Sequence, residues 1–145
     1  VPASRDDVWR AFTENAGAVE FFAPAAKIEL EIGGSYELYF DTEAPEGKRG
    51  SEGVKVLSYQ PKEMFSFSWN APVIFPEIRE QRTWVVLLFE NAGENVTKVR
   101  LSHLGWGEGG DWDKVYDYFE HAWDIVLNRL AQRFRTGPID WEALG

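Results

Sequence analysis

Residues 103–112, HLGWGEGGDW, combine residue types and a spacing from which a nucleotide site can be built. Gly105, Gly107 and Gly110 follow the G-x-G-x-x-G pattern, in which glycines let the backbone approach a pyrophosphate at the start of a helix. That fingerprint also requires a second parallel strand after the helix. The short segment after the helical run here contains a Gly-Pro pair and cannot form such a strand. We therefore interpret the glycines as a flexible crossover from a strand to a helix and expect no cofactor.

Two histidines are the next candidates for chemistry. His103 alternates with Val99 and Leu101, which places it on the inner face of a sheet. There it would bind a ligand carbonyl or act as an acid or base inside an apolar cavity. The alternative is a structural histidine whose ring is satisfied by a backbone carbonyl. His121 falls on the flank of a helix, and because the two histidines lie on different elements without paired-ligand spacing, we expect no metal site.

Nucleophilic catalysis finds little support in the sequence. There is no cysteine, no G-x-S-x-G, no H-E-x-x-H and no phosphate-binding loop. Ser102 precedes His103, so strand alternation sends their side chains to opposite faces. An enzyme that uses His103 as acid or base, with Tyr36 or Tyr59 as hydrogen-bond donors, is therefore the least favoured reading.

Aromatic residues are the strongest lead to function. They make up 15% of the chain and include seven tryptophans, which indicates a lined cavity, a bulky core, or both. Strand and helix spacing gathers several of them on inner faces, and both readings stay open. The residues predicted to contact a ligand are Tyr36, Leu38, Phe40, Phe65, Phe67, Trp69, Val85, Leu87, Leu101, His103, Phe119 and Trp123.

Composition limits the partners. The chain of 145 residues fits one domain, 1–145. Its net charge of −9 repels phosphate backbones and anionic lipid, so we expect no nucleic-acid binding. No apolar run approaches the roughly 20 residues that cross a bilayer, so we expect no membrane insertion. Localisation, cytoplasmic or exported, stays open.

The apolar periodicity predicts the elements that must position these residues. Two short helices come first, one capped by Ser4 and one carrying Val19, Phe21 and Phe22 after a break at residues 15–17. Six strands follow at 27–32, 36–40, 53–59, 64–69, 82–90 and 96–104, with a tight turn at Gly33-Gly34 and a loop at 70–81. A long helix runs from an Asp111 N-cap to Gly137 with an apolar stripe of Val115, Phe119, Ala122, Val126, Leu130 and Phe134. Short connectors predict antiparallel neighbours, and the curled sheet must be covered by the long helix.

The strand TWVVLLFE at 83–90 is apolar on both faces. If Val85 and Leu87 face the helix, then Trp84, Val86 and Leu88 face outwards. Exposed apolar rows of this kind mark partner surfaces. We therefore expect a homodimer or a protein partner on the outer sheet face.

Taken together, the chain resembles the activator of heat-shock-protein-90 ATPase homologue family, within the START-like SRPBCC superfamily. The matching stretches are VPASRDDVWRAFT (1–13), EIGGSYEL (31–38), PKEMFSFSW (61–69), TKVRLSHLGW (97–106) and YFEHAWDIVLNRLAQRF (118–134). The resemblance implies an α+β helix-grip fold, in which a curved antiparallel sheet of about six strands wraps around a long C-terminal helix. It also implies an apolar cavity between the sheet and that helix. Family members usually begin with a strand just before the V-P-A-S stretch, so we expect that strand to be missing before residue 1.

The resemblance implies no single activity. Relatives assist a chaperone, bind lipids, hormones or polyketides, or catalyse cyclisation or hydration. We expect a domain that binds a small apolar molecule, with a co-chaperone-like interaction domain as the alternative.

Overall fold

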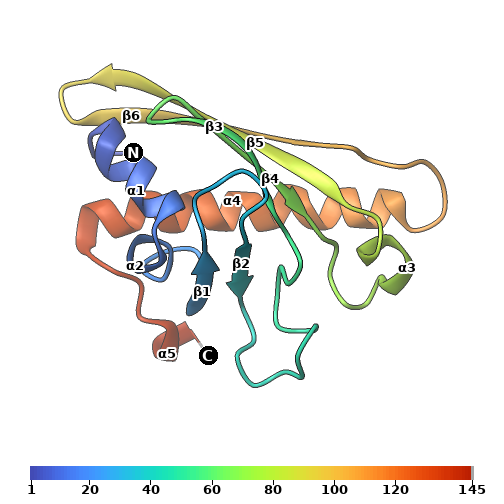
Figure 1. The fold of residues 1–145 in the computed structure, drawn as a ribbon. Coiled ribbons are helices and arrows are strands. Elements are labelled where there is room, and N and C mark those ends of the chain that lie inside the picture. Colours follow the sequence, from blue (N-terminus) through green and yellow to red (C-terminus); the bar gives the residue numbers. More distant parts are fainter. Residues whose placement is uncertain (145) are drawn as a thin grey trace.

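The computed structural model describes residues 1–144 and has the predicted α+β helix-grip architecture, with a curved antiparallel sheet over a long C-terminal helix (Figure 1). The elements in chain order are α1 (Arg5–Thr13), α2 (Asn15–Ala18), β1 (Ala25–Ile28), β2 (Tyr36–Tyr39), β3 (Val56–Gln60), β4 (Met64–Trp69), α3 (Pro76–Arg79), β5 (Thr83–Gly93), β6 (Val96–Leu104), α4 (Trp112–Thr136) and α5 (Trp141–Leu144).

The strands form two antiparallel groups rather than one uninterrupted sheet. β3, β4, β5 and β6 pair in chain order, and β1 pairs with β2. Isolated bridges from Ser35 to Lys55 and from Tyr39 to Gly50 join the second group to the first. At the other edge, the backbone of Val1 exchanges hydrogen bonds with Thr97 of β6, each 2.9 Å long.

The first hairpin differs from the prediction. Pairing of β1 with β2 ends at Ile28 and Tyr36, and the strand predicted over 27–32 does not continue. Instead, the Gly33 N–H donates to the carbonyl of Val56 and the Val56 N–H donates to the carbonyl of Gly34, each at 2.8 Å. These bonds turn the segment between β1 and β2 towards β3. Ile32 is therefore 68% exposed, and the apolar alternation of this segment does not correspond to a buried face.

The structure adds detail to three local expectations. α2 occupies the predicted break at residues 15–17, and the residues after it form a turn. Gly17 permits this, because a Cβ there would lie 2.5 Å from the carbonyl oxygen of Arg10. Asp111 is the N-cap residue of α4, as predicted, although its side chain makes no capping hydrogen bond and lies 3.4 Å from Lys114. The loop predicted over 70–81 contains α3.

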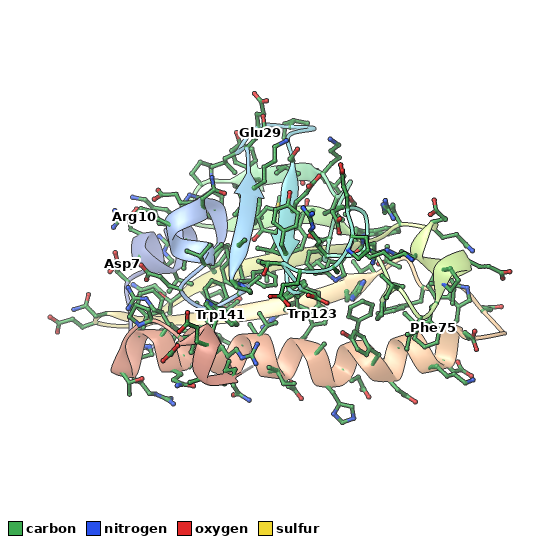
Figure 2. All side chains as sticks on the ribbon, turned by 90° about the horizontal axis from the view of Figure 1, so that it is seen from below. Asp7, Arg10, Glu29, Phe75, Trp123 and Trp141 are labelled. Carbon is green, nitrogen blue, oxygen red and sulfur yellow. The ribbon has the colours of Figure 1, made fainter. Side chains whose placement is uncertain are left out.

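The long helix lies along the inner face of the sheet, as Figure 1 shows. Its buried residues are Val115, Phe119, Trp123, Val126 and Leu130, close to the predicted stripe. α1 covers one end of the same face and buries Val8, Trp9 and Phe12. It is capped, as predicted, by Ser4, whose hydroxyl accepts from the Asp7 N–H at 3.2 Å. The core therefore lies between the sheet, α1 and α4, with Trp123 in the space between α4 and the strands (Figure 2).

Candidate ligand-binding site

A cleft of about 250 Å³ opens between α4 and the segment that follows β4. Its volume lies just below the roughly 300–1,000 Å³ that is typical of drug-sized sites. The lining residues are Phe22, Phe40, Gly50, Trp69, Asn70, Ala71, Pro72, Arg79, Tyr118, Phe119, Ala122, Trp123, Ile125, Val126 and Arg129.

The inner wall of the cleft consists of packed aromatic rings. Alternation along β4 turns Trp69 inwards, and the four-residue spacing of Phe119 and Trp123 places both on one face of α4. The Trp69 and Trp123 ring centroids are 5.2 Å apart, and Phe119 stacks on Trp123 at 6.0 Å. Each ring is held by its neighbours, so the inner wall of the cleft is an apolar, packed aromatic surface.

Arg79, one of the polar residues of the cleft, holds its loops together. The Arg79 guanidinium donates to the carbonyls of Ala71, Gly47 and Gly50 at 2.6–2.9 Å, and it lies 3.7 Å from the carboxylate of Glu52. Burial lowers the pKa of Arg79, although the charge of Glu52 opposes that shift. Arg79 therefore ties the loop before β3 to the segment after β4.

The predicted ligand contacts separate into two groups. Phe40, Trp69, Phe119 and Trp123 line the cleft. The others lie deeper: Tyr36, Leu38, Phe65, Phe67, Val85 and Leu87 are fully buried, and Leu101 and His103 lie partly buried on β6. Tyr36 illustrates the packing, since its ring centroid lies 4.4 Å from that of Phe67 and 5.0 Å from that of Phe65. Contact between this deeper group and a ligand stays a prediction.

Sequence reasoning missed several lining residues. Ala122 and Arg129 share a helical face with Phe119 and Val126, at spacings of three, four and three residues, so the periodicity contained that signal. Arg79 belongs to a segment predicted as loop, and nothing in the sequence pattern indicated that its guanidinium reaches three carbonyls.

His103 faces inwards, as predicted, but both of its ring nitrogens are occupied by side chains. Nε2 lies 2.6 Å from the Thr83 hydroxyl, and Nδ1 lies 3.0 Å from Nε1 of Trp123. The ring also packs against Trp106 and Phe119, at 4.2 Å and 4.8 Å. Burial lowers the pKa of His103 to about 4, so the ring is neutral near pH 7. The backbone carbonyl expected as its partner is not used, and no lone pair is left for proton transfer.

The hydroxyl of Tyr36 also has a structural hydrogen-bond partner. It donates to the carbonyl of Phe12 at 2.7 Å, and burial raises the pKa of Tyr36 well above its ordinary value. Tyr59, the other donor considered for catalysis, reaches the carbonyl of Leu30 at 3.4 Å. Among residues 1–144, no group of three histidine or carboxylate side chains is placed to hold a metal ion.

The sequence profile of the family described as "Activator of Hsp90 ATPase homolog 1-like protein" (AHSA1) matches residues 2–135. The chain belongs to the AHSA1 family. This confirms the resemblance drawn from the five sequence stretches. A comparison with curated proteins found no significant match.

Solved structures share the AHSA1 helix-grip fold with this chain at low sequence identity. MLL2253 from Mesorhizobium loti has a TM-score of 0.73 at 17% identity, over 96% of this chain and 94% of that one. The Aha1 dimer from Colwellia psychrerythraea has a TM-score of 0.69 at 20% identity, over 94% and 92%. PFC0360w, an HSP90 activator from Plasmodium falciparum, has a TM-score of 0.66 at 17% identity, over 94% and 91%. At these identities the likeness establishes the fold alone.

Two glycines of the 103–112 segment, Gly105 and Gly107, are packed against indole rings in this AHSA1-family chain. A Cβ on Gly105 would lie 2.4 Å from the ring of Trp84, and a Cβ on Gly107 would lie 2.3 Å from the ring of Trp112. Gly105 also has a φ of 86°, which glycine adopts without strain. The segment joins β6 to α4, and its glycines allow a close crossover past two tryptophans.

A second hollow, of about 490 Å³, lies between α3 and the residues before α4. Its lining includes the carboxylates of Glu77, Glu108 and Asp111 and offers less apolar surface than the first cleft. A wide, acid-lined hollow made from loops lacks the apolar enclosure of small-molecule sites. Among residues 1–144, no helix is both long and apolar enough to cross a membrane.

Proposed function

We propose that this member of the AHSA1 family binds a small apolar molecule in the cleft between α4 and the end of β4. The observation that supports this most directly is an open volume of about 250 Å³ beside a core of buried side chains. Its wall is formed by Trp69, Phe119 and Trp123. Burial of a ligand against these rings contributes about 25 cal/mol for each Å² of apolar surface removed from water.

Binding is favoured over catalysis because, among residues 1–144, no histidine or carboxylate side chain lines the cleft. The ring nitrogens of His103 bond to Thr83 and Trp123, and His103 does not line the cleft. Asn70 and Arg79, which do line it, donate to backbone carbonyls. Asn70 and Arg79 thus shape the site, and the described lining contains no nucleophile–base pair.

The proposal is tested with naphthalene-2-carboxamide, a flat neutral probe, by isothermal titration and by tryptophan emission. Binding should quench emission in the native chain and less so in Trp69→Phe, which removes an indole from the cleft wall. Native mass spectrometry of gently purified protein should show a retained small-molecule adduct. No heat, no quenching and no adduct across a panel of lipid-like and aromatic compounds would count decisively against a ligand-binding cleft.

A co-chaperone-like interaction domain is the second candidate, and the outer sheet face favours it. Trp84 on that face is 42% exposed, Leu104 pairs beside it, and Val86 and Leu88 are partly exposed. In Figure 1, α4 lies on the inner side of the sheet, and no described helix covers the outer side. The related Colwellia psychrerythraea protein is a dimer, so we propose a second copy of this chain as the first occupant to test.

A further inference from the structure

The charges that line the cleft have the opposite sign to the protein as a whole. The chain has 24 acidic and 15 basic residues, with a net charge of −9. Within residues 1–144, the charged side chains that line the cleft are nevertheless those of Arg79 and Arg129, and no carboxylate lines it. A positive lining in an acidic protein points to an anionic group on the ligand.

The two arginines differ in what their guanidinium groups already bind. Arg79 donates to three backbone carbonyls and lies near Glu52. Arg129 makes no ion pair within 4.0 Å and no hydrogen bond with the residues that the structure describes, 1–144. One turn further along α4, Arg133 is paired with Glu20. Arg129 is therefore the cleft cation available to a ligand.

Packing against an aromatic ring positions the Arg129 guanidinium. Its Cζ lies 5.3 Å from the centroid of Trp141 in α5, and its side chain is partly buried. Stacking uses the face of the guanidinium and leaves its N–H edge able to bind both oxygens of a carboxylate. Partial burial also reduces the screening of such a pair by solvent.

We propose that the ligand of this cleft is an amphipathic carboxylate whose head group pairs with Arg129 and whose apolar body packs on Trp69 and Trp123. This inference rests on the proposed function, since it names the chemistry of the molecule that the cleft takes.

Three probes of nearly the same shape separate the head-group effect from apolar binding. They are naphthalene-2-carboxylate, the neutral carboxamide and the cationic 2-(aminomethyl)naphthalene, each titrated calorimetrically into the native chain. We expect the carboxylate to bind about tenfold more tightly than the carboxamide, as a charge-assisted bidentate pair should, and the ammonium to bind most weakly. In Arg129→Gln the preference for the carboxylate should fall to about one while the carboxamide affinity is kept.

Arg135→Gln is the matched control, because Arg135 lies exposed on the same helix and its loss changes the net charge equally. Arg135→Gln should leave the preference for the carboxylate unchanged. Arg129→Lys keeps the positive charge but not the two parallel N–H donors of the guanidinium, so it should give an intermediate preference. If the carboxamide binds as tightly as the carboxylate, or if Arg129→Gln keeps the preference, the head-group inference is wrong and the apolar cleft stands. If none of the three probes binds, both the inference and the proposed function fail.

Discussion

The indole N–H of Trp123 donates to Nδ1 of His103 across 3.0 Å, which joins α4 to β6 by a side-chain hydrogen bond. Because the indole nitrogen can only donate, Nδ1 must accept, and the ring proton lies on Nε2 facing the Thr83 hydroxyl. A protonated imidazolium would have no lone pair for the indole. The bond therefore holds only while His103 is neutral.

The first prediction concerns acid stability. Burial lowers the pKa of His103 to about 4, whereas an imidazole in the unfolded chain takes up a proton near pH 6.5. Between these values the unfolded state binds more protons, so the free energy of unfolding falls as the pH is lowered through that window. The expected loss from His103 is roughly 2–3 kcal/mol between pH 7 and pH 4.5, measured by urea unfolding.

Carboxylates also titrate near the lower end of this window, so the comparison is made with His103→Gln, which stays neutral throughout. The variant should be less stable than the native chain at pH 7 but should lose less free energy on acidification. Equal pH slopes for the two proteins would show that His103 takes up its proton as readily in the folded state as in the unfolded state.

Tyr36→Phe should destabilise the fold without disturbing its shape. The substitution keeps the ring packed against Phe65 and Phe67 but removes the hydroxyl that donates to the Phe12 carbonyl. A buried carbonyl left without its donor lowers the free energy of unfolding by about 1–3 kcal/mol. Denaturant unfolding would measure this loss, with an unchanged dependence of the free energy on denaturant concentration. The exposed Tyr116, changed to Phe, is the control and should alter stability by less than about 0.5 kcal/mol. Equal effects in the two variants would contradict the structural role given to the Tyr36 hydroxyl.

Ala122→Phe should close the cleft from the α4 side. Ala122 is partly exposed and lines the cleft, so a phenyl ring can occupy the open space without entering the packed core. We expect the affinity for naphthalene-2-carboxamide to fall at least about tenfold, while thermal stability stays the same or rises because apolar surface is buried. His121→Phe, one residue away on the exposed flank, should keep the affinity. Undiminished binding by Ala122→Phe would place the probe elsewhere on the protein.

Leu88→Lys tests the outer face of the sheet. Leu88 is partly exposed beside Arg100 of β6, so a lysine places like charges opposite each other and would put an unpaired charge in any apolar contact between copies. If the native chain dimerises through this face, sedimentation should show a dissociation constant raised by about tenfold or more in the variant. His121→Lys on α4 carries the same charge change and should leave the constant unaltered. A native chain that sediments as a monomer at high micromolar concentration would exclude the homodimer.

Periodicity alone predicted the order and type of the main elements. Alternation marked the strands around Phe65 and Val85, and the stripe from Val115 to Leu130 marked the long helix, because burial on one face imposes a period of about 2 on strands and 3.6 on helices. The same logic failed at Leu30 and Ile32, where the hydrogen bonds of Gly33 and Gly34 to Val56 turn the chain away from the core.

For the main strands and the long helix, the sequence by itself determined which residues face the interior. The tertiary structure decided which parts of that interior are filled by side chains and which part remains open as a cleft. Phe67 and Trp69 share one face of β4, yet Phe67 is closed in by Tyr36 and Trp69 borders the cleft, since packing depends on neighbours from distant parts of the chain. His103 and Arg129 show the same division. Their chemical type is evident in the sequence, but only the fold brings Trp123 to the nitrogen of one and the ring of Trp141 beneath the guanidinium of the other.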